Sequence, residues 1–157
     1  MKLKMSFSTI LLILVSSTLS AQEDSFQLTE VAPKVTTYLL ERRPGWQHRP
    51  RPDAANQRAT VSHWERNGII VRVAIFAPDI PRAEMAEAIR EFATDEKATK
   101  VEGLGDEAYA HGKNGASVVF RMNNLTIAIS TNAGDRVNRQ MLVREFARLV
   151  ADALRAT

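Results

Sequence analysis

The chain has 157 residues, of which 45% are hydrophobic and 25% are charged, and its formal net charge is +3. This composition is typical of a soluble globular protein of about one domain and excludes an intrinsically disordered chain. The sequence contains no cysteine, which excludes disulfides, thiolate metal sites and the lipid attachment of a bacterial lipoprotein.

The first 21 residues have the three parts of a secretory signal peptide. Lys2 and Lys4 form its basic region, residues 7–15 are apolar, and small residues precede the expected cleavage after Ala21. Because a membrane span needs roughly 20 apolar residues, we expect a cleaved signal rather than an anchor, and no stable membrane span afterwards. Loss of both lysines lowers the charge from +3 to +1, which gives no electrostatic case for nucleic acid. The sequence predicts a periplasmic or secreted protein.

After a loose N-terminus over residues 22–27, we expect a single domain over residues 28–157 that begins with a helix. Its apolar residues recur at spacings of three and four, as in an amphipathic helix: Leu28, Val31, Val35, Tyr38 and Leu39. Thr29 is the expected N-cap, with Pro33 in the first turn. Pro44-Gly45 should end the helix.

The segment Arg42 to Arg58 is irregular and proline-rich, so we expect an extended, solvated backbone. It is the one locally basic stretch, and two interpretations stay open. It is either a surface for an anionic ligand or an envelope protein, or a loop that ties the first helix to the sheet with Trp46 packed as a lid. The candidate binding residues in it are Arg42, Arg43, Trp46, His48, Arg49 and Arg51.

Residues 59–76 are predicted to form a hairpin around Asn67-Gly68, a favoured type I′ turn. This turn places Trp64 opposite Val71 and directs one face to the core: Trp64, Val71, Val73 and Ile75. The other face carries Val61, His63, Glu65, Ile70, Arg72 and Ala74. A helix capped by Asp79 should follow and end near Lys97, before a charged link.

The stretch Gly103 to Thr131 is predicted to be a β-meander. It begins with a turn in which Gly103 and Gly105 adopt positive φ, and continues with a short run over residues 107–111. A second hairpin turns at Asn123-Asn124 and directs six apolar residues to one face: Val118, Phe120, Met122, Leu125, Ile127 and Ile129. An intervening turn of two or four residues would put Tyr109 on the same face, as an anchor in the core.

The sequence GLGDEAY at residues 103–109, before a meander and a final helix, resembles a turn in small exported bacterial α+β domains. These include actinobacterial lipoproteins and the extracellular sensor domains of PknH-type kinases, although this chain lacks the cysteines that such proteins often carry. The resemblance implies export and sensing or binding rather than a reaction.

A last helix should begin at Asp135 or Asn138, with a stripe of Leu142, Phe146, Leu149, Val150 and Leu154. We therefore predict an α+β fold: one antiparallel sheet of about five strands with two or three helices on one face. The order α-ββα-βββα would contain two repeated ββα units.

The chemistry-bearing residues favour binding over catalysis. His48, His63 and His111 lack metal-ligand spacing, and the expected registers put His63 and His111 on opposite faces, so no metal or cofactor is expected. No Gly-x-Ser-x-Gly elbow occurs. We expect a non-catalytic binding or sensing module that uses the basic segment and the open sheet face, where His63, Arg72 and Arg121 lie; a homodimer through that face stays open. The alternative is a small hydrolase or transferase around His63, Arg72 and Glu65.

Overall fold

The computed structural model describes residues 28–52, 59–77, 98–111 and 116–156. It is an α+β fold with one antiparallel sheet of seven strands, in the order β1-β2-β3-β7-β6-β5-β4. The strands, in chain order, are β1 (Gln47–Pro50), β2 (Ala59–Arg66), β3 (Ile69–Phe76), β4 (Thr99–Lys100), β5 (Glu107–His111), β6 (Ser117–Met122) and β7 (Leu125–Thr131). The predicted signal peptide, the loose residues 22–27 and the helix from Asp79 to Lys97 lie outside the described residues.

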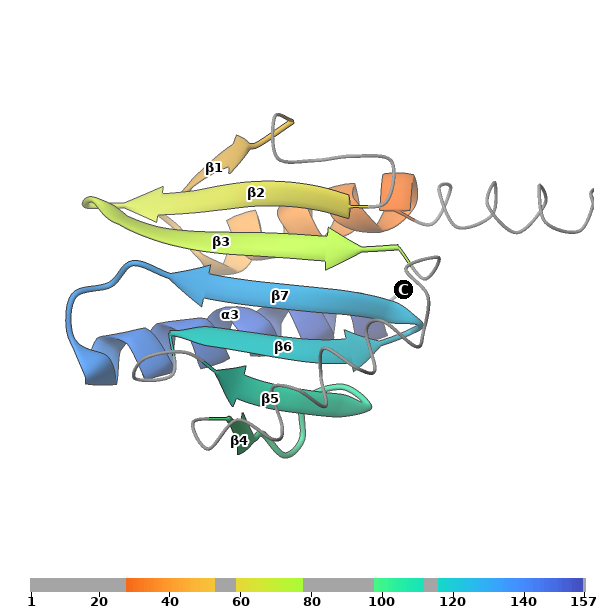
Figure 1. Cartoon of the computed structure of the whole chain (residues 1–157). Helices are drawn as coiled ribbons and strands as arrows, with labels where there is room; N and C mark the ends of the chain where they lie inside the picture. The colour runs from red at the N-terminus through yellow and green to blue at the C-terminus, as the bar shows by residue number, and fades with distance from the viewer. Residues whose placement is uncertain (1–27, 53–58, 78–97, 112–115, 157) are drawn as a thin grey trace, which may run out of the picture.

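Two helices are described, and both cover the same face of the sheet. Figure 1 shows the N-terminal helix (residues 28–42, orange) behind β1–β3 and α3 (Arg136–Arg155, blue) behind β6 and β7. The predicted apolar stripe of the N-terminal helix is confirmed, because Leu28, Val35 and Leu39 are buried in the core. Neither helix is long and apolar enough to cross a membrane.

Both predicted hairpins have the predicted turns and registers. Asn67 and Gly68 have φ of 52° and 78°, and Asn123 and Asn124 have φ of 52° and 63°, the positive values that type I′ turns require. Trp64 pairs with Val71 and Phe120 with Ile127. The hairpins join through β3 and β7, where Val73 lies opposite Ile129. Since the second helix of the expected repeat is not described, the repeated ββα order stays a prediction.

The predicted count of about five strands is wrong, because the sheet has two further strands, β1 and β4, at its edges. Part of the segment expected to be irregular forms β1, which pairs with β2 from Gln47↔Glu65 to Pro50↔Ser62. The expected charged link contains β4, which pairs with β5 at Thr99↔Ala110. Both are short and mostly exposed, so neither buries the row of apolar side chains that makes a strand recognisable in a sequence.

The expected start of the first helix is also wrong. Leu28 and Thr29 are already helical, so Thr29 is not the N-cap and Pro33 lies beyond the first described turn. Leu28 is buried in the core, and the helix extends far enough to place it there.

At the other terminus of the chain, Asp135 caps α3 as predicted, with its carboxylate accepting a hydrogen bond of 2.9 Å from Asn138 N.

Tyr109 lies on the face opposite to the one expected. β5 and β6 pair with His111 opposite Ser117, which leaves the odd-numbered connection 112–116 between them and sets Tyr109 opposite Val119. An odd connection reverses the sidedness that a two- or four-residue turn would give. Ala108 and Ala110 therefore enter the core instead, and the Tyr109 hydroxyl donates to Glu107 Oε1 at 3.0 Å on the face away from the core. The buried anchor of the glycine turn is Leu104.

The glycine turn itself is as predicted. Gly103 and Gly105 have φ of 73° and 61°. Asp106 N donates a hydrogen bond of 2.8 Å to Arg121 O, which fastens the turn to β6. A Cβ on Gly105 would lie 2.2 Å from the same Arg121 oxygen, so the turn approaches the strand too closely for any other residue.

Candidate functional site

The alternation of β1 separates two surfaces at one edge of the sheet. Gln47 and Arg49 pair with Glu65 and His63 on the face opposite the two described helices, here called the reverse face. His48 pairs with Trp64 on the helix side. One four-residue strand therefore contributes to a polar network on one face and to an apolar cleft on the other.

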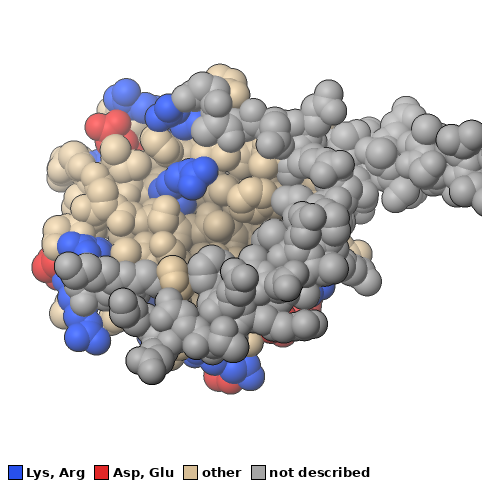
Figure 2. All heavy atoms as spheres, in the orientation of Figure 1, with Lys and Arg blue, Asp and Glu red and all other residues tan. Residues whose placement is uncertain are grey.

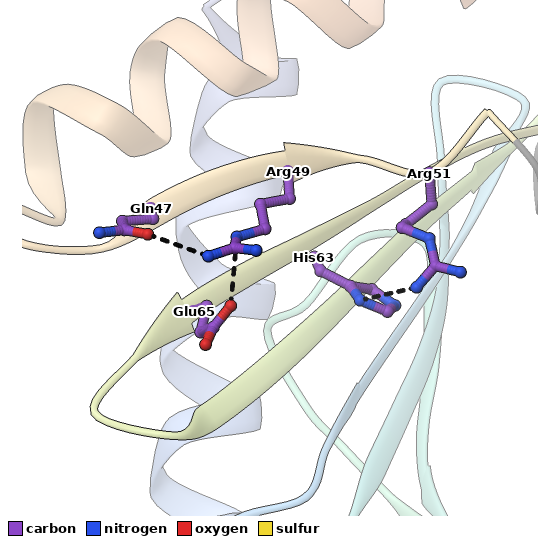
Figure 3. A network of polar contacts seen from close by, with 5 residues as sticks. All are labelled: Gln47, Arg49, Arg51, His63 and Glu65. Atoms are coloured by element: carbon purple, nitrogen blue, oxygen red, sulfur yellow. Dashed lines mark hydrogen bonds and ion pairs between the residues drawn. The ribbon is translucent and has the colours of Figure 1, made fainter.

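Figure 3 shows the polar network on the reverse face. Arg49 Nε lies 3.2 Å from Glu65 Oε2, and Arg49 Nη2 donates to Gln47 Oε1 at 3.4 Å. Arg51 Nη1 lies 3.4 Å from His63 Nδ1. These contacts join β1 and the residue after it to β2, and they fix the edge strand to the sheet.

Three further candidate residues of the basic segment, Arg42, Arg43 and Trp46, have partners within the chain too. Arg42 lies over the Tyr38 ring at 3.5 Å, and Arg43 is paired with Glu145 and lies 5.2 Å from the centre of the Phe146 ring. Trp46 is buried and meets the Phe146 ring edge-on at 5.1 Å. Arg42 therefore packs on its own helix, whereas Arg43 and Trp46 pack this part of the segment against α3. The link from the segment to the sheet is β1, which pairs with β2.

On the reverse face His63 and Arg72 lie opposite each other in β2 and β3, with Glu65 two residues from His63, but the hollow that the described residues form around Arg72 includes neither His63 nor Glu65. A hollow of about 280 Å³ is lined by Ile70, Arg72, Ser130, Thr131 and Asn132, without His63 or Glu65. Arg72 is exposed on β3, and Arg121 lies on β6 opposite Thr126. In Figure 2, which is turned to this face, the tan area carries one basic side chain near its centre.

The expectation that His63 and His111 lie on opposite faces is wrong. The odd connection before β6 places His111 with Ser117 on the reverse face, which also carries His63. The two strands that carry these histidines are separated by three others, or about 19 Å at 4.8 Å per strand spacing. Within the residues that the structure describes, no group of three His, Asp or Glu side chains could hold a metal ion.

The helix side of the same edge holds a cleft of about 510 Å³ between the N-terminal helix and β1–β3. Most of its wall is apolar: Ala32, Pro33, Val35, Pro50, Pro52, Val61, Trp64, Val73 and Ile75. The other lining residues are Thr36, Thr37, His48, Arg51, Thr60 and Ser62. Its size is within the 300–1,000 Å³ typical of small-molecule sites.

Two aromatic rings meet in the wall of this cleft. The rings of His48 and Trp64 are 4.8 Å apart and inclined by 43°. Burial lowers the pKa of His48, because the partly desolvated ring is less able to carry a charge. Trp64 is 1% exposed, and its Nε1 has no hydrogen-bond acceptor in the described part of the chain.

Of the residues singled out from the sequence as binding candidates, His48 and Arg51 line the cleft. The sequence pattern predicts Trp64 only as a core residue, and it gives no sign that Thr36 and Thr37 line a cleft. The volume of the cleft depends on the distance between the N-terminal helix and β1–β3, and no local sequence pattern predicts that distance.

Comparison of the chain with protein-family models, with curated proteins and with solved structures finds no match in any of the three.

Proposed function

We propose that this chain is an exported, non-catalytic binding or sensing module of the bacterial envelope that takes an apolar ligand into the cleft beside the N-terminal helix. The observation that carries the proposal is the cleft itself: about 510 Å³, walled mainly by apolar side chains. Hydrophobic and aromatic lining with a few polar groups is the usual character of ligand sites. Export rests on the three-part signal sequence over residues 1–21.

The cleft is a better candidate than the basic segment. Arg42, Arg43, Arg49 and Arg51 each have a partner within the chain, so an anionic ligand would compete with existing contacts. The alternative is a hydrolase or transferase around His63, Arg72 and Glu65, of which His63 and Arg72 lie opposite each other in β2 and β3. Glu65 is engaged by Arg49 and His63 by Arg51, and the nearby hollow at Arg72 includes neither.

A neutral apolar dye tests the proposal. N-phenylnaphthylamine fluoresces more strongly in apolar surroundings, and we expect saturable binding to the signal-free protein. Ser62→Phe places a large side chain in the cleft and should abolish that binding. Ser130→Phe is the matched control, because Ser130 lies opposite Arg72 on the reverse face.

Circular dichroism would establish that both variants are folded. Thr36→Phe fills the same cleft from the helix side, and it replaces Ser62→Phe if that variant does not fold. Dye binding that survives both filling substitutions, or that Ser130→Phe abolishes equally, would reject the cleft as the binding site.

A further inference from the structure

A second hollow, with charged residues in its wall, lies at the edge of the sheet opposite to the cleft. It has a volume of about 160 Å³ and lies between α3 and the segment that runs from β4 into the glycine turn. Its described lining residues are Lys100, Val101, Glu102, Gly103, Leu104, Arg144 and Arg148. Leu104 is buried and Val101 packs against the core, so the hollow rests on the closed core. This volume is below that of a typical small-molecule site and suits a single charged group.

The described lining of this hollow has more positive than negative charge. Lys100, Arg144 and Arg148 are cations, and Glu102 is the one carboxylate among the described lining residues. Lys100 Nζ lies 3.1 Å from Glu102 Oε1, so these two charges offset each other. Neither arginine has an ion pair within the part of the chain that the structure describes. The hollow therefore carries two positive charges that an anion could neutralise.

The spacing of the two arginines strengthens the case for an anion. Arg144 and Arg148 are four residues apart on α3, where like charges lie on the same face and repel each other. The carboxylate of Glu145, which follows Arg144, is paired with Arg43. Guanidinium groups present forks of N–H donors that match the oxygens of a phosphate group. A bound anion would turn the repulsion between the two arginines into attraction.

We propose that this hollow binds the phosphate group of a small soluble molecule, with Arg144 and Arg148 donating hydrogen bonds to the phosphate oxygens. Lys100 adds positive charge from the edge of the sheet. A phosphate monoester carries nearly two negative charges at pH 7 and so matches two free arginines better than a monocarboxylate does. The rest of the molecule would extend into solvent, because the hollow is too small to enclose it.

This site is separate from the apolar cleft of the proposed function. β4 and β1 form opposite edges of the sheet, and five strands lie between them (Figure 1). Neither set of described lining residues shares a member with the other. The phosphate site therefore goes beyond the proposed function, and each can stand or fail without the other.

A titration followed by nuclear magnetic resonance tests the site with three probes: inorganic phosphate, glycerol 3-phosphate and acetate. We expect both phosphates to shift the backbone amide signals of Gly103 and Leu104 saturably, and acetate to bind about tenfold more weakly. The amide of Trp64 should not shift, because Trp64 lies outside this hollow. Equal affinity for the two phosphates would identify free phosphate as a sufficient ligand, and tighter binding of glycerol 3-phosphate would identify a phosphate ester. Either result supports the site.

Substitutions on α3 separate a local site from general attraction by charge. Arg148→Gln should weaken phosphate binding about tenfold, because it removes one charge-assisted donor. Arg136→Gln is the matched control, since Arg136 is exposed on the same helix and does not line the hollow. It removes the same charge and should change the affinity less than about twofold.

Glu102→Gln tests the same site by a gain of affinity. It removes the described carboxylate of the lining and releases Lys100 from its ion pair. Phosphate should then bind about two- to fivefold more tightly, as the loss of an exposed ion pair allows. Circular dichroism would establish that the variants are folded, and Arg144→Gln replaces Arg148→Gln if that variant does not fold.

Three results would overturn the inference. Equal losses for Arg148→Gln and Arg136→Gln would mean that the net charge of the protein, and not the hollow, attracts the anion. Acetate binding as tightly as phosphate would remove the selection of a phosphate group. No saturable shift at Gly103 and Leu104 with either phosphate would exclude the site, while dye binding in the apolar cleft would still decide the proposed function.

Discussion

The two hairpins of the sheet have the same turn chemistry, but the helices cover them differently. Trp64 and Phe120 each stand three residues before the turn asparagine, and each points to the helix side. Over β6 and β7, α3 packs Val143, Phe146 and Val150, which are 0% exposed.

Beside β1–β3, the N-terminal helix instead contributes Ala32, Thr36 and Thr37 to the wall of the cleft. Alanine is smaller than the phenylalanine and valines of α3, and threonine, which is about as large as valine, is much smaller than phenylalanine. These side chains leave space that larger ones would fill. The two hairpins therefore differ in role because of the helices that cover them. Large side chains on the helix close the core over β6 and β7, and smaller ones leave a cleft beside β1–β3.

The largest expected effect on stability is in the half of the sheet that α3 covers, β6 and β7, here called the closed half. Phe120→Ala should lower the free energy of unfolding by about 3–5 kcal/mol, because it truncates an aromatic side chain that is 0% exposed. Arg121→Ala, on the reverse face, should cost less than about 1 kcal/mol. Urea unfolding measures both, and comparable losses would mean that the two faces of β6 are not distinct in their packing.

The glycine turn fixes the outer edge of the closed half. Gly105→Ala should cost about 2–4 kcal/mol, since the new Cβ would lie 2.2 Å from Arg121 O at a φ of +61°. Gly103→Ala is the matched control, because its φ of +73° is similar but nothing lies within 4 Å. Thermal unfolding should show a much smaller loss for Gly103→Ala, and equal losses would remove the close approach to β6 as the cause.

A pair of valines tests the comparison between the halves directly. Val143 is 0% exposed under α3, and Val143→Ala should cost about 2–3 kcal/mol. Val35 is 3% exposed but lines the cleft, so part of its surface already lacks neighbours. Val35→Ala should therefore cost about 1 kcal/mol less than Val143→Ala. A larger loss at Val35 would contradict an open cleft beneath the N-terminal helix.

The smallest expected effect is a pH dependence of stability, and it comes from the half of the sheet beside the cleft, β1–β3. Burial lowers the pKa of His48 below 6.5, so the unfolded chain takes up this proton before the folded protein does. The stability that neutral His48 contributes is complete above about pH 6.5 and falls as the pH drops toward the folded pKa. A titration of the His48 ring signals by nuclear magnetic resonance checks the direction, and a pKa at or above 6.5 would contradict it.

Much of the fold could be predicted, because hairpin turns and helix stripes are local signals. The asparagine turns, both registers and the cap at Asp135 all follow from short sequence patterns. β1 could not be recognised in the same way. Its residues alternate between a polar network and a partly open cleft, so the strand lacks the apolar period that marks a buried one.

The errors at Tyr109 and His111 have one cause. Sidedness along β5 depends on whether the connection before β6 has an odd or even number of residues, and a single residue reverses it. The candidate site was harder to predict than the fold, because the cleft depends on the spacing between a helix and three strands. Among the residues that line the cleft, the sequence marks only His48 and Arg51 as binding candidates, and it assigns Trp64 to the core.

The most direct test of a binding cleft in one half of the sheet is methyl-group chemical-shift mapping with N-phenylnaphthylamine. Val35, Val73 and Ile75 line the cleft, whereas Val118, Ile127 and Ile129 lie in the closed core. Saturable shifts should appear in the first three residues and leave the second three almost unchanged. Equal shifts in both groups, or none in the first, would contradict the account.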